Sequence, residues 1–307
     1  MTVSAAQGQD FPNRSITILV GLAAGGITDV TTRQYAELVS KNVGQSIVIE
    51  NRTGAAGAVA AAAVQNAPAD GYTLLSVVGA QFASVPAMGT TGYDPVKGFA
   101  PITLLFRLPT LLVVPANSPA KSVPELLALG KKKPGGLLLG SPGAGSPGHL
   151  LAALISMGTN TPMQYVHYRG GAPLMTDLVA ERLDFTLASY NSARSNIEAN
   201  KLRALAVDAD KRLPAIPDIP TFAEAGLGQF KVGDWCGLLA PAATPKSVIA
   251  KLNAEFVKAA RTPELIKRLT DNGNLIASST PEEMSRIVIE EVKMMEQLIT
   301  KLGLKTK

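Results

Sequence analysis

The residues best suited to chemistry lie in two glycine-rich loops, each followed by a helix-like stretch. One loop, within residues 137–155 (LLLGSPGAGSPGHLLAALI), carries the spacing G-x-G-x-x-G at 143–148. The other, within residues 16–34 (ITILVGLAAGGITDVTTRQ), contains Gly25 and Gly26. The first N–H groups of a helix have no intrahelical partner and lie at the positive end of the helix dipole. Both loops are therefore candidate anion sites.

One anion that suits such a loop is a dinucleotide. That interpretation requires an acidic residue about 20 positions after the glycines, to hold a ribose hydroxyl. The corresponding window, residues 161–171 (TPMQYVHYRGG), contains no acid. Arg169 could hold a 2′-phosphate instead, which keeps an NADP-dependent enzyme open as an alternative. A phosphate-loop NTPase is excluded because no Lys-Ser or Lys-Thr follows the glycines.

A second interpretation is acyl chemistry on a serine. Residues 144–148 (AGSPG) differ by one position from the G-x-S-x-G nucleophile elbow, with Ser146 as the nucleophile. Its base would have to be His149 or His167, the only histidines of the chain. His149 lies three residues further along the same helix, and His167 lies on the next expected strand. Packing or hydrogen bonding is the simpler role for both, and a hydrolase remains an alternative.

A third interpretation is a small carboxylate that is bound without reaction. Two helix starts, one in each half of the chain, would donate N–H groups to a single head group. Hydroxyl groups of Thr28, Ser141 and Ser146 would add hydrogen bonds. Several donors are needed together, because removing a carboxylate from water is costly. The occurrence of two such loops in one chain favours this interpretation over isolated tight turns.

The composition narrows the class of protein. A chain of 307 residues with 46% hydrophobic residues can bury a sizeable core, and its length indicates two lobes. The net charge of +5 suits anionic ligands, but no basic block with interleaved aromatics indicates a nucleic-acid partner. One cysteine excludes an internal disulfide, and with two histidines we expect neither a metal site nor a cofactor. No apolar run reaches the roughly 18 residues that cross a bilayer.

Strand-like runs alternate with helix-like stretches, which predicts an α/β fold. Several of the strand-like runs are apolar throughout, as parallel strands covered on both faces are. In the C-terminal third, Thr244, Thr262 and Thr280 each precede a proline and are candidate N-caps. The apolar stripe of the last helix predicts core packing. Strands are expected at 15–20, 46–50, 72–77, 110–114, 137–140, 163–168, 184–189, 202–207 and 235–240, and helices at 29–43, 172–181, 245–261, 263–272 and 281–302.

A series of motifs runs in order along nearly the whole chain. They include ITILVGLAAGGITDVTTRQ, APADGYTLL, YDPVKGFAPIT, SPGAGSPGHL, HYRGGAPLMTDL, PDIPTFAEAG and WCGLLAPAATP. Together they resemble the extracytoplasmic solute receptors of tripartite tricarboxylate transporters, known as the Bug family. Each motif alone is weak, whereas the ordered series is specific.

The resemblance implies an α/β fold with two lobes, the periplasmic-binding-protein or Venus-flytrap fold, with a ligand cleft between the lobes. We expect one lobe from residues 1–110 and 236–307, and the other from 111–235. The resemblance also implies a periplasmic protein that captures a small carboxylate or dicarboxylate and passes it to the membrane permease subunits of the transporter. We expect a monomer without enzymatic activity, and we interpret the polar residues 1–15 as the remainder of a removed export signal with an added Met.

The resemblance also nominates binding residues. For Asp29 a capping role in its own helix is favoured, because a bare carboxylate would repel an anionic ligand. Arg169 either supplies positive charge to the ligand or pairs with a nearby acid, and Trp235 is expected to pack between the lobes. The nominated residues are Ala24, Gly25, Gly26, Thr28, Asp29, Ala80, Gln81, Ser141, Gly145, Ser146, Arg169, Ser189, Tyr190 and Asn191.

Two departures from the family pattern bear on the ligand. Leu22 stands where the family commonly has Phe, so a ring that could cover the ligand is missing. Ala188 stands where the family often has Asp, so no acid is present there to pair with an ammonium group. Tyr190 and Asn191 offer neutral contacts instead. We therefore expect a carboxylate ligand without an amino group.

Overall fold

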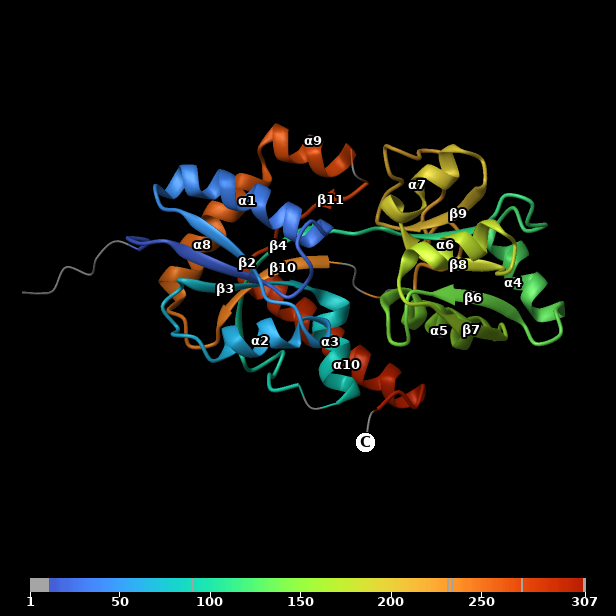
Figure 1. The fold of residues 1–307 in the computed structure, drawn as a ribbon, viewed down its shortest axis with the longest axis horizontal. Coiled ribbons are helices and arrows are strands. Elements are labelled where there is room, and N and C mark those ends of the chain that lie inside the picture. Colours follow the sequence, from blue (N-terminus) through green and yellow to red (C-terminus); the bar gives the residue numbers. More distant parts are fainter. Residues whose placement is uncertain (1–10, 90, 231, 233–234, 272, 306–307) are drawn as a thin grey trace, which may run out of the picture.

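The computed structural model describes residues 11–89, 91–230, 232, 235–271 and 273–305, and these residues form two α/β lobes that lie side by side (Figure 1). Each lobe is built on one mixed sheet. The strand order is β11-β4-β10-β3-β1-β2 in the first sheet and β7-β6-β8-β5-β9 in the second. The first sheet contains β1 (Ile16–Val20), β2 (Ile47–Asn51), β3 (Thr73–Val78), β4 (Phe99–Arg107), β10 (Trp235–Pro241) and β11 (Leu275–Ile276), and the second contains β5 (Thr110–Pro115), β6 (Leu137–Ser141), β7 (Met163–His167), β8 (Phe185–Ser189) and β9 (Leu202–Asp208).

Helices cover both faces of each sheet. In the first lobe α1 and α8 pack on one face, and α2, α3 and α10 pack on the other (Figure 1). Among the helices that the structure describes, none has the length and apolar character needed to cross a bilayer. Their bounds are α1 (Ile27–Val43), the short 3₁₀ helix η1 (Ala55–Gly57), α2 (Ala58–Gln65), α3 (Gly79–Met88), α4 (Val123–Lys132), α5 (Pro147–Thr159), α6 (Gly171–Val179), α7 (Tyr190–Glu198), α8 (Lys246–Ala260), α9 (Pro263–Asp271) and α10 (Pro281–Lys301).

The predicted strands are confirmed, with ends that differ by no more than one residue. Two strands were not predicted, β4 and the two-residue β11. The run FAPITLLFR of β4 contains Pro101, and a proline within a run argues against a central strand. The structure accommodates it at an irregularity, because the register between β4 and β10 shifts between Leu238 and Leu239, which pair with Thr103 and Pro101.

The expectation that the wholly apolar strands run parallel is wrong for β5 and β10. Every residue of these two strands is buried, but β5 is antiparallel to β8 and β9, and β10 is antiparallel to β3 and β4. A strand is buried on both faces when helices cover both faces of its sheet, whether it runs parallel or antiparallel to its neighbours. An apolar run therefore predicts that helices cover the strand, but it does not predict the direction of the strand.

The three Thr-Pro helix starts differ from one another. Thr280 caps α10 as predicted, through a capping box in which its side chain accepts from the Glu283 N–H. The N-cap of α8 is Pro245, and the Thr244 prediction is therefore wrong. The hydroxyl of Thr262 donates to the Ala259 carbonyl at 2.8 Å.

The apolar stripe of α10 lies in the core as predicted, with Met284 and Met295 fully buried.

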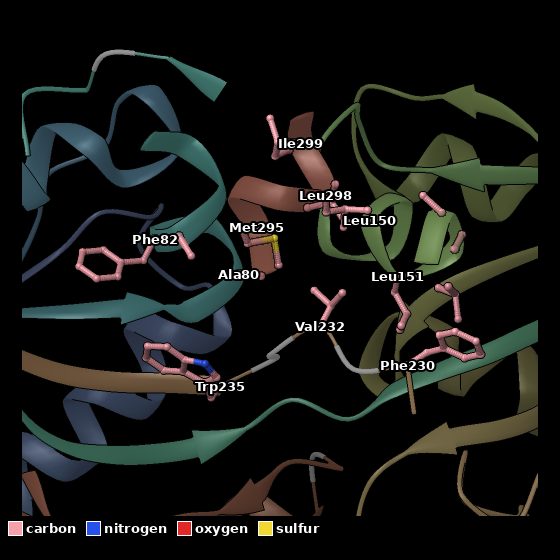
Figure 2. Close-up of a cluster of buried hydrophobic side chains, with 14 of the residues drawn as sticks. Ala80, Phe82, Leu150, Leu151, Phe230, Val232, Trp235, Met295, Leu298 and Ile299 are labelled. Atoms are coloured by element: carbon pink, nitrogen blue, oxygen red, sulfur yellow. The ribbon is translucent and has the colours of Figure 1, made fainter. Parts of the chain in front are cut away.

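One cluster of buried apolar side chains continues from the first lobe into the second (Figure 2). It contains Met295 and Leu298 of α10 together with Leu150 and Leu151 of α5. Trp235, at the start of β10, belongs to the same cluster and is 1% exposed. The close contacts of the Trp235 ring are with Gly79 and Gly237 of the first lobe, so its packing between the lobes stays a prediction. The lobes therefore meet over an apolar surface.

Candidate functional site

The loop between β1 and α1 is held by Asp29. The helix begins after Gly26, which makes no side-chain cap. Asp29, 3% exposed, reaches back from the first turn, and its Oδ2 accepts the Gly25 N–H at 2.9 Å. Its Oδ1 accepts from Arg33 Nε and Asn51 Nδ2, each at 3.0 Å. Asp29 therefore secures the start of its own helix, as its capping interpretation predicted, although the amide it binds precedes the N-cap.

These bonds keep Asp29 ionised. Burial by itself opposes ionisation of the carboxyl, but hydrogen bonds from Arg33, the Gly25 N–H and Asn51 together outweigh it and lower the pKa of Asp29. The charge of Arg33 acts in the same direction. The negative charge at this helix start is thus compensated within the lobe.

The loop between β6 and α5 is held in the same manner by His149. The N-cap of α5 is Ser146, and Pro147 is its first residue. The Nδ1 atom of His149 accepts the Gly145 N–H at 3.0 Å. Further back, Ser141 Oγ donates to the Gly143 carbonyl at 3.2 Å. The helix start and the preceding strand are therefore both tied to the loop.

Several amides that the sequence nominated as ligand donors are committed within these loops. The Gly25 and Gly145 amides bind Asp29 and His149, as described above. The Gly26 N–H donates to the Ala23 carbonyl at 3.3 Å, and the Ser146 N–H donates to the Gly143 carbonyl at 3.2 Å. In this conformation these four amides shape the loops and are not free to bind a ligand.

The amides of the first helical turns are placed differently. In α1 the N–H groups of Ile27 and Thr28 have no partner within the helix. In α5 Pro147 has no N–H, and Gly148 and His149 supply the corresponding groups. Within the described residues, the hydroxyl oxygens of Thr28 and Ser146 are buried without a hydrogen-bond partner. Each helix start thus combines backbone donors with one buried, unused hydroxyl.

The loop after β3 forms the first turn of α3. Ala80 is 1% exposed, so it can offer only its backbone. Gln81 lines a cavity of about 20 Å³ at the carboxyl ends of β1 and β3, together with Leu22 and Tyr93. This volume holds about one water molecule. Leu22, which stands where the family commonly has Phe, therefore lies close to Gln81 in the loop after β3.

The second loop approaches this part of the first lobe. Gly145 has a φ of +74°, and a Cβ there would lie 2.9 Å from the Sδ atom of Met88 at the end of α3. Trp235 lies against the start of α3, since a Cβ at Gly79 would be 2.1 Å from its ring. Figure 2 shows Trp235 and Ala80 on the same side of the apolar cluster. Helix α3 of the first lobe thus approaches the α5 loop through Met88.

The remaining nominated residues lie around the second lobe. Ser189 is the N-cap of α7, and its hydroxyl pairs with Ser192 at 2.9 Å. Tyr190 is 5% exposed and packs against Gly273, where a Cβ would lie 2.1 Å from its ring. Asn191 and Arg169 are exposed. In the described part of the chain Arg169 forms no ion pair, which favours its role as a free positive charge.

The structure does not assemble a hydrolase site at Ser146. Its hydroxyl has no partner among the described residues, and His149 is bound to the Gly145 amide. The Nδ1 atom of His167 lies 2.7 Å from Ser141 Oγ and therefore pairs with Ser141 rather than with Ser146. Ser141 is 1% exposed, and its hydroxyl also donates to the Gly143 carbonyl. No group of three metal-ligating side chains occurs in the residues that the structure describes.

The lowered pKa of His149 predicts that the protein loses stability in acid. Burial, followed by the charge of His167, lowers the pKa of His149 from 6.5 to about 4. Between these values the unfolded chain binds more protons than the folded one, so the free energy of unfolding falls as the pH drops from about 6.5 to about 4. We expect a loss of about 1–3 kcal/mol over this window, measured by urea unfolding. In His149→Asn the free energy of unfolding should fall less over the same pH range. An equal fall in both proteins would show that His149 is not the group responsible.

Comparison with known proteins identifies the family. A sequence profile of the tripartite tricarboxylate transporter family receptor, TctC, matches residues 31–304. The chain belongs to the TctC receptor family. The resemblance drawn from the motifs is thereby confirmed. A UPF0065 protein from Pseudomonas sp. strain P51 is 36% identical to this TctC receptor over 99% of the chain and 92% of the relative.

Solved structures of similar proteins agree with this assignment. The R. palustris protein Rpa4515, solved with adipate, is 33% identical with a TM-score of 0.78, and the alignment covers 96% of this chain and 99% of that one. MatC from Rhodopseudomonas palustris, solved with malate, is 32% identical with a TM-score of 0.74, covering 94% and 100%. This TctC receptor is therefore a two-lobed solute-binding protein rather than an enzyme, which removes the NADP-dependent and hydrolase alternatives.

Proposed function

We propose that this TctC receptor captures a small dicarboxylate between its lobes and delivers it to the permease subunits of a tripartite tricarboxylate transporter. The observation that carries the proposal is the pair of helix starts, α1 and α5, that lie in different lobes and share one design. In both, the glycine amides are satisfied internally and the amides of the first helical turn remain for a ligand. Relatives solved with adipate and malate support a dicarboxylate.

We infer that the lobes comprise residues 1–110 with 236–307, and residues 111–235, and that they close on the ligand. The strands of the first sheet fall within 16–107 and 235–276, which supports this division, and β5 begins at Thr110 in the second sheet. A ligand that contacts both lobes favours the closed state. Periplasmic relatives support a periplasmic location, and we propose that the receptor acts there as a monomer.

The proposed binding set follows from which groups remain unused. Asp29, Gly25, Gly26 and Gly145 act by shaping the loops. The direct donors are the amides of Ile27, Thr28, Gly148 and His149 and the hydroxyls of Thr28 and Ser146. Arg169 and Asn191 are exposed candidates for the far end of the ligand. Ala24, Ala80, Gln81, Ser141, Ser189 and Tyr190 remain proposed members of the surrounding wall.

We propose further that the ligand carries no amino group. Ala188, on β8, is the position at which an acid would hold an ammonium group, and its side chain is a methyl group. It pairs with Leu111 of β5 and lies among apolar neighbours. An ammonium group placed there would lose its hydration without gaining an opposite charge.

Calorimetry with paired ligands tests the proposal. We expect the purified protein to bind adipate or malate, and to bind succinate and glutarate more tightly than aspartate and glutamate. At a ligand concentration of about 100 times Kd the free energy of unfolding should rise by about 2.7 kcal/mol. The ligands should be recovered unchanged after incubation. Failure of every dicarboxylate to bind would overturn the ligand class, and tighter binding of the amino acids would overturn the inference from Ala188.

A further inference from the structure

The two helix starts use the same hydrogen bond. In α1, Asp29 occupies the third helical position and accepts the N–H of Gly25, the residue before the N-cap, at 2.9 Å. In α5, His149 occupies the third helical position and accepts the N–H of Gly145, again the residue before the N-cap, at 3.0 Å. The acceptor in each case is a δ atom of the side chain. A carboxylate and an imidazole therefore perform the same geometric task.

The two acceptors differ in charge. The Asp29 carboxylate is negative, and it is paired with Arg33 at 3.0 Å and with Asn51. His149 can accept at Nδ1 only when that nitrogen carries no proton, so the ring is neutral with its proton on Nε2. Among the described residues no ion pair reaches the loop 141–146 or the first turn of α5. A negative charge at position 149 would therefore have no arginine partner of the kind that Arg33 provides for Asp29.

The ring of His149 is fixed by its surroundings. The side chain is 4% exposed. Its ring meets Tyr165 edge to face at a centroid distance of 4.8 Å and His167 at 4.7 Å. Gly145, which it holds, has a φ of +74°, one of many backbone conformations open to glycine, so the bond to His149 selects among them. The rigid ring thus holds the peptide that leads into the N-cap Ser146.

We infer that His149 is a positioning residue of the anion site, which orders the loop before α5 while adding no negative charge beside the ligand. This inference rests on the proposed binding of a dicarboxylate. The imidazole aims the α5 amides by fixing Gly145. An aspartate at the same position would keep the hydrogen bond but would repel the ligand.

Three substitutions at His149 separate geometry from charge. Asn and Asp carry a δ oxygen at the same distance along the side chain as Nδ1, and Asp29 shows that such a group makes this bond. Leu removes the acceptor. At pH 7.5, with malate and adipate as probes, we expect His149→Leu to weaken binding about tenfold or more, and His149→Asn to recover most of that loss. His149→Asp should bind about tenfold more weakly than His149→Asn.

A matched control places the same charge elsewhere on the helix. Met157 lies on α5 with 42% of its surface exposed, far along the helix from Gly145. Met157→Asp should leave the Kd within about twofold of the parent protein. Equal affinities for His149→Asn and His149→Asp would remove the charge argument. Equal affinities for His149→Asn and His149→Leu would remove the positioning argument.

A second readout does not depend on ligand. Hydrogen exchange of the Gly145 amide should be slow in the parent protein and in His149→Asn, and at least about tenfold faster in His149→Leu. If the parent protein binds no dicarboxylate, the proposed function fails while this measurement still tests the positioning role. Equal protection of Gly145 in all three proteins would overturn that role.

Discussion

Gly148→Ala should destabilise the second lobe by about 3 kcal/mol. A Cβ at this position would lie 2.5 Å from the carbonyl oxygen of Leu187. That carbonyl belongs to β8, which is paired on both sides, with β5 and β6, and cannot withdraw without breaking the sheet. The last glycine of the G-x-G-x-x-G spacing is therefore required because α5 packs directly on the backbone of a central strand.

The control for this variant is Gly171→Ala. Gly171 is likewise in the first turn of a helix of the same lobe, α6, but a Cβ there meets nothing within 4 Å. We expect it to be neutral or to stabilise by about 0.4–1 kcal/mol, because alanine reduces the freedom of the unfolded chain. Urea unfolding followed by circular dichroism compares the two. A Gly148→Ala protein as stable as Gly171→Ala would show that the helix and strand are not in close contact.

Ile27→Pro should weaken dicarboxylate binding by about 10- to 100-fold. Residue 27 is the first position of α1, where proline is compatible with the helix and removes only an N–H that has no intrahelical partner. The preceding Gly26 has φ −70° and ψ 162°, which a following proline permits. A hydrogen bond to a charged group contributes about 1.5–3 kcal/mol, which corresponds to this change in Kd. Pro147 already occupies the same position of α5.

Ile27→Ala is the matched control, since it shortens the side chain and keeps the N–H. Calorimetry should give Ile27→Ala a Kd near that of the parent protein, while circular dichroism confirms that both variants are folded. Equal affinities for Ile27→Pro and Ile27→Ala would mean that the first amide of α1 does not reach the ligand. Proline at Ser146 would be a poorer test, because the Ser146 N–H already closes a turn onto Gly143.

The sequence predicted the elements of this protein well where the signal is local. Apolar runs placed the strands, and the Thr280-Pro281 pair marked the start of α10. The strand β4 was missed for a local reason as well, because its run contains Pro101 and a proline argues against a central strand. These predictions succeed because burial of a short segment and the geometry of a helix start depend on a few consecutive residues.

The candidate site was located by sequence only as far as the two loops. The glycine spacing and the ordered family motifs nominated these loops, while a hydrolase and an NADP-dependent enzyme stayed open until the family was identified. The sequence nominated both helix starts and their loops, but it did not show that the amides of Gly25, Gly26, Gly145 and Ser146 bind Asp29, Ala23, His149 and Gly143. Residue types alone do not reveal whether a side chain turns back onto the backbone of its own loop.

Tertiary structure alone decided three further features: the antiparallel course of β5 and β10, the contact of Met88 with the Gly145 loop, and the packing of Tyr190 against Gly273. Each joins segments that are far apart along the chain. Local patterns fix which surface of a segment is apolar and how a helix begins. The partner of that surface, and the amide that a buried acceptor reaches, depend on the path of the whole chain, because the same apolar face or acceptor can be satisfied by many partners.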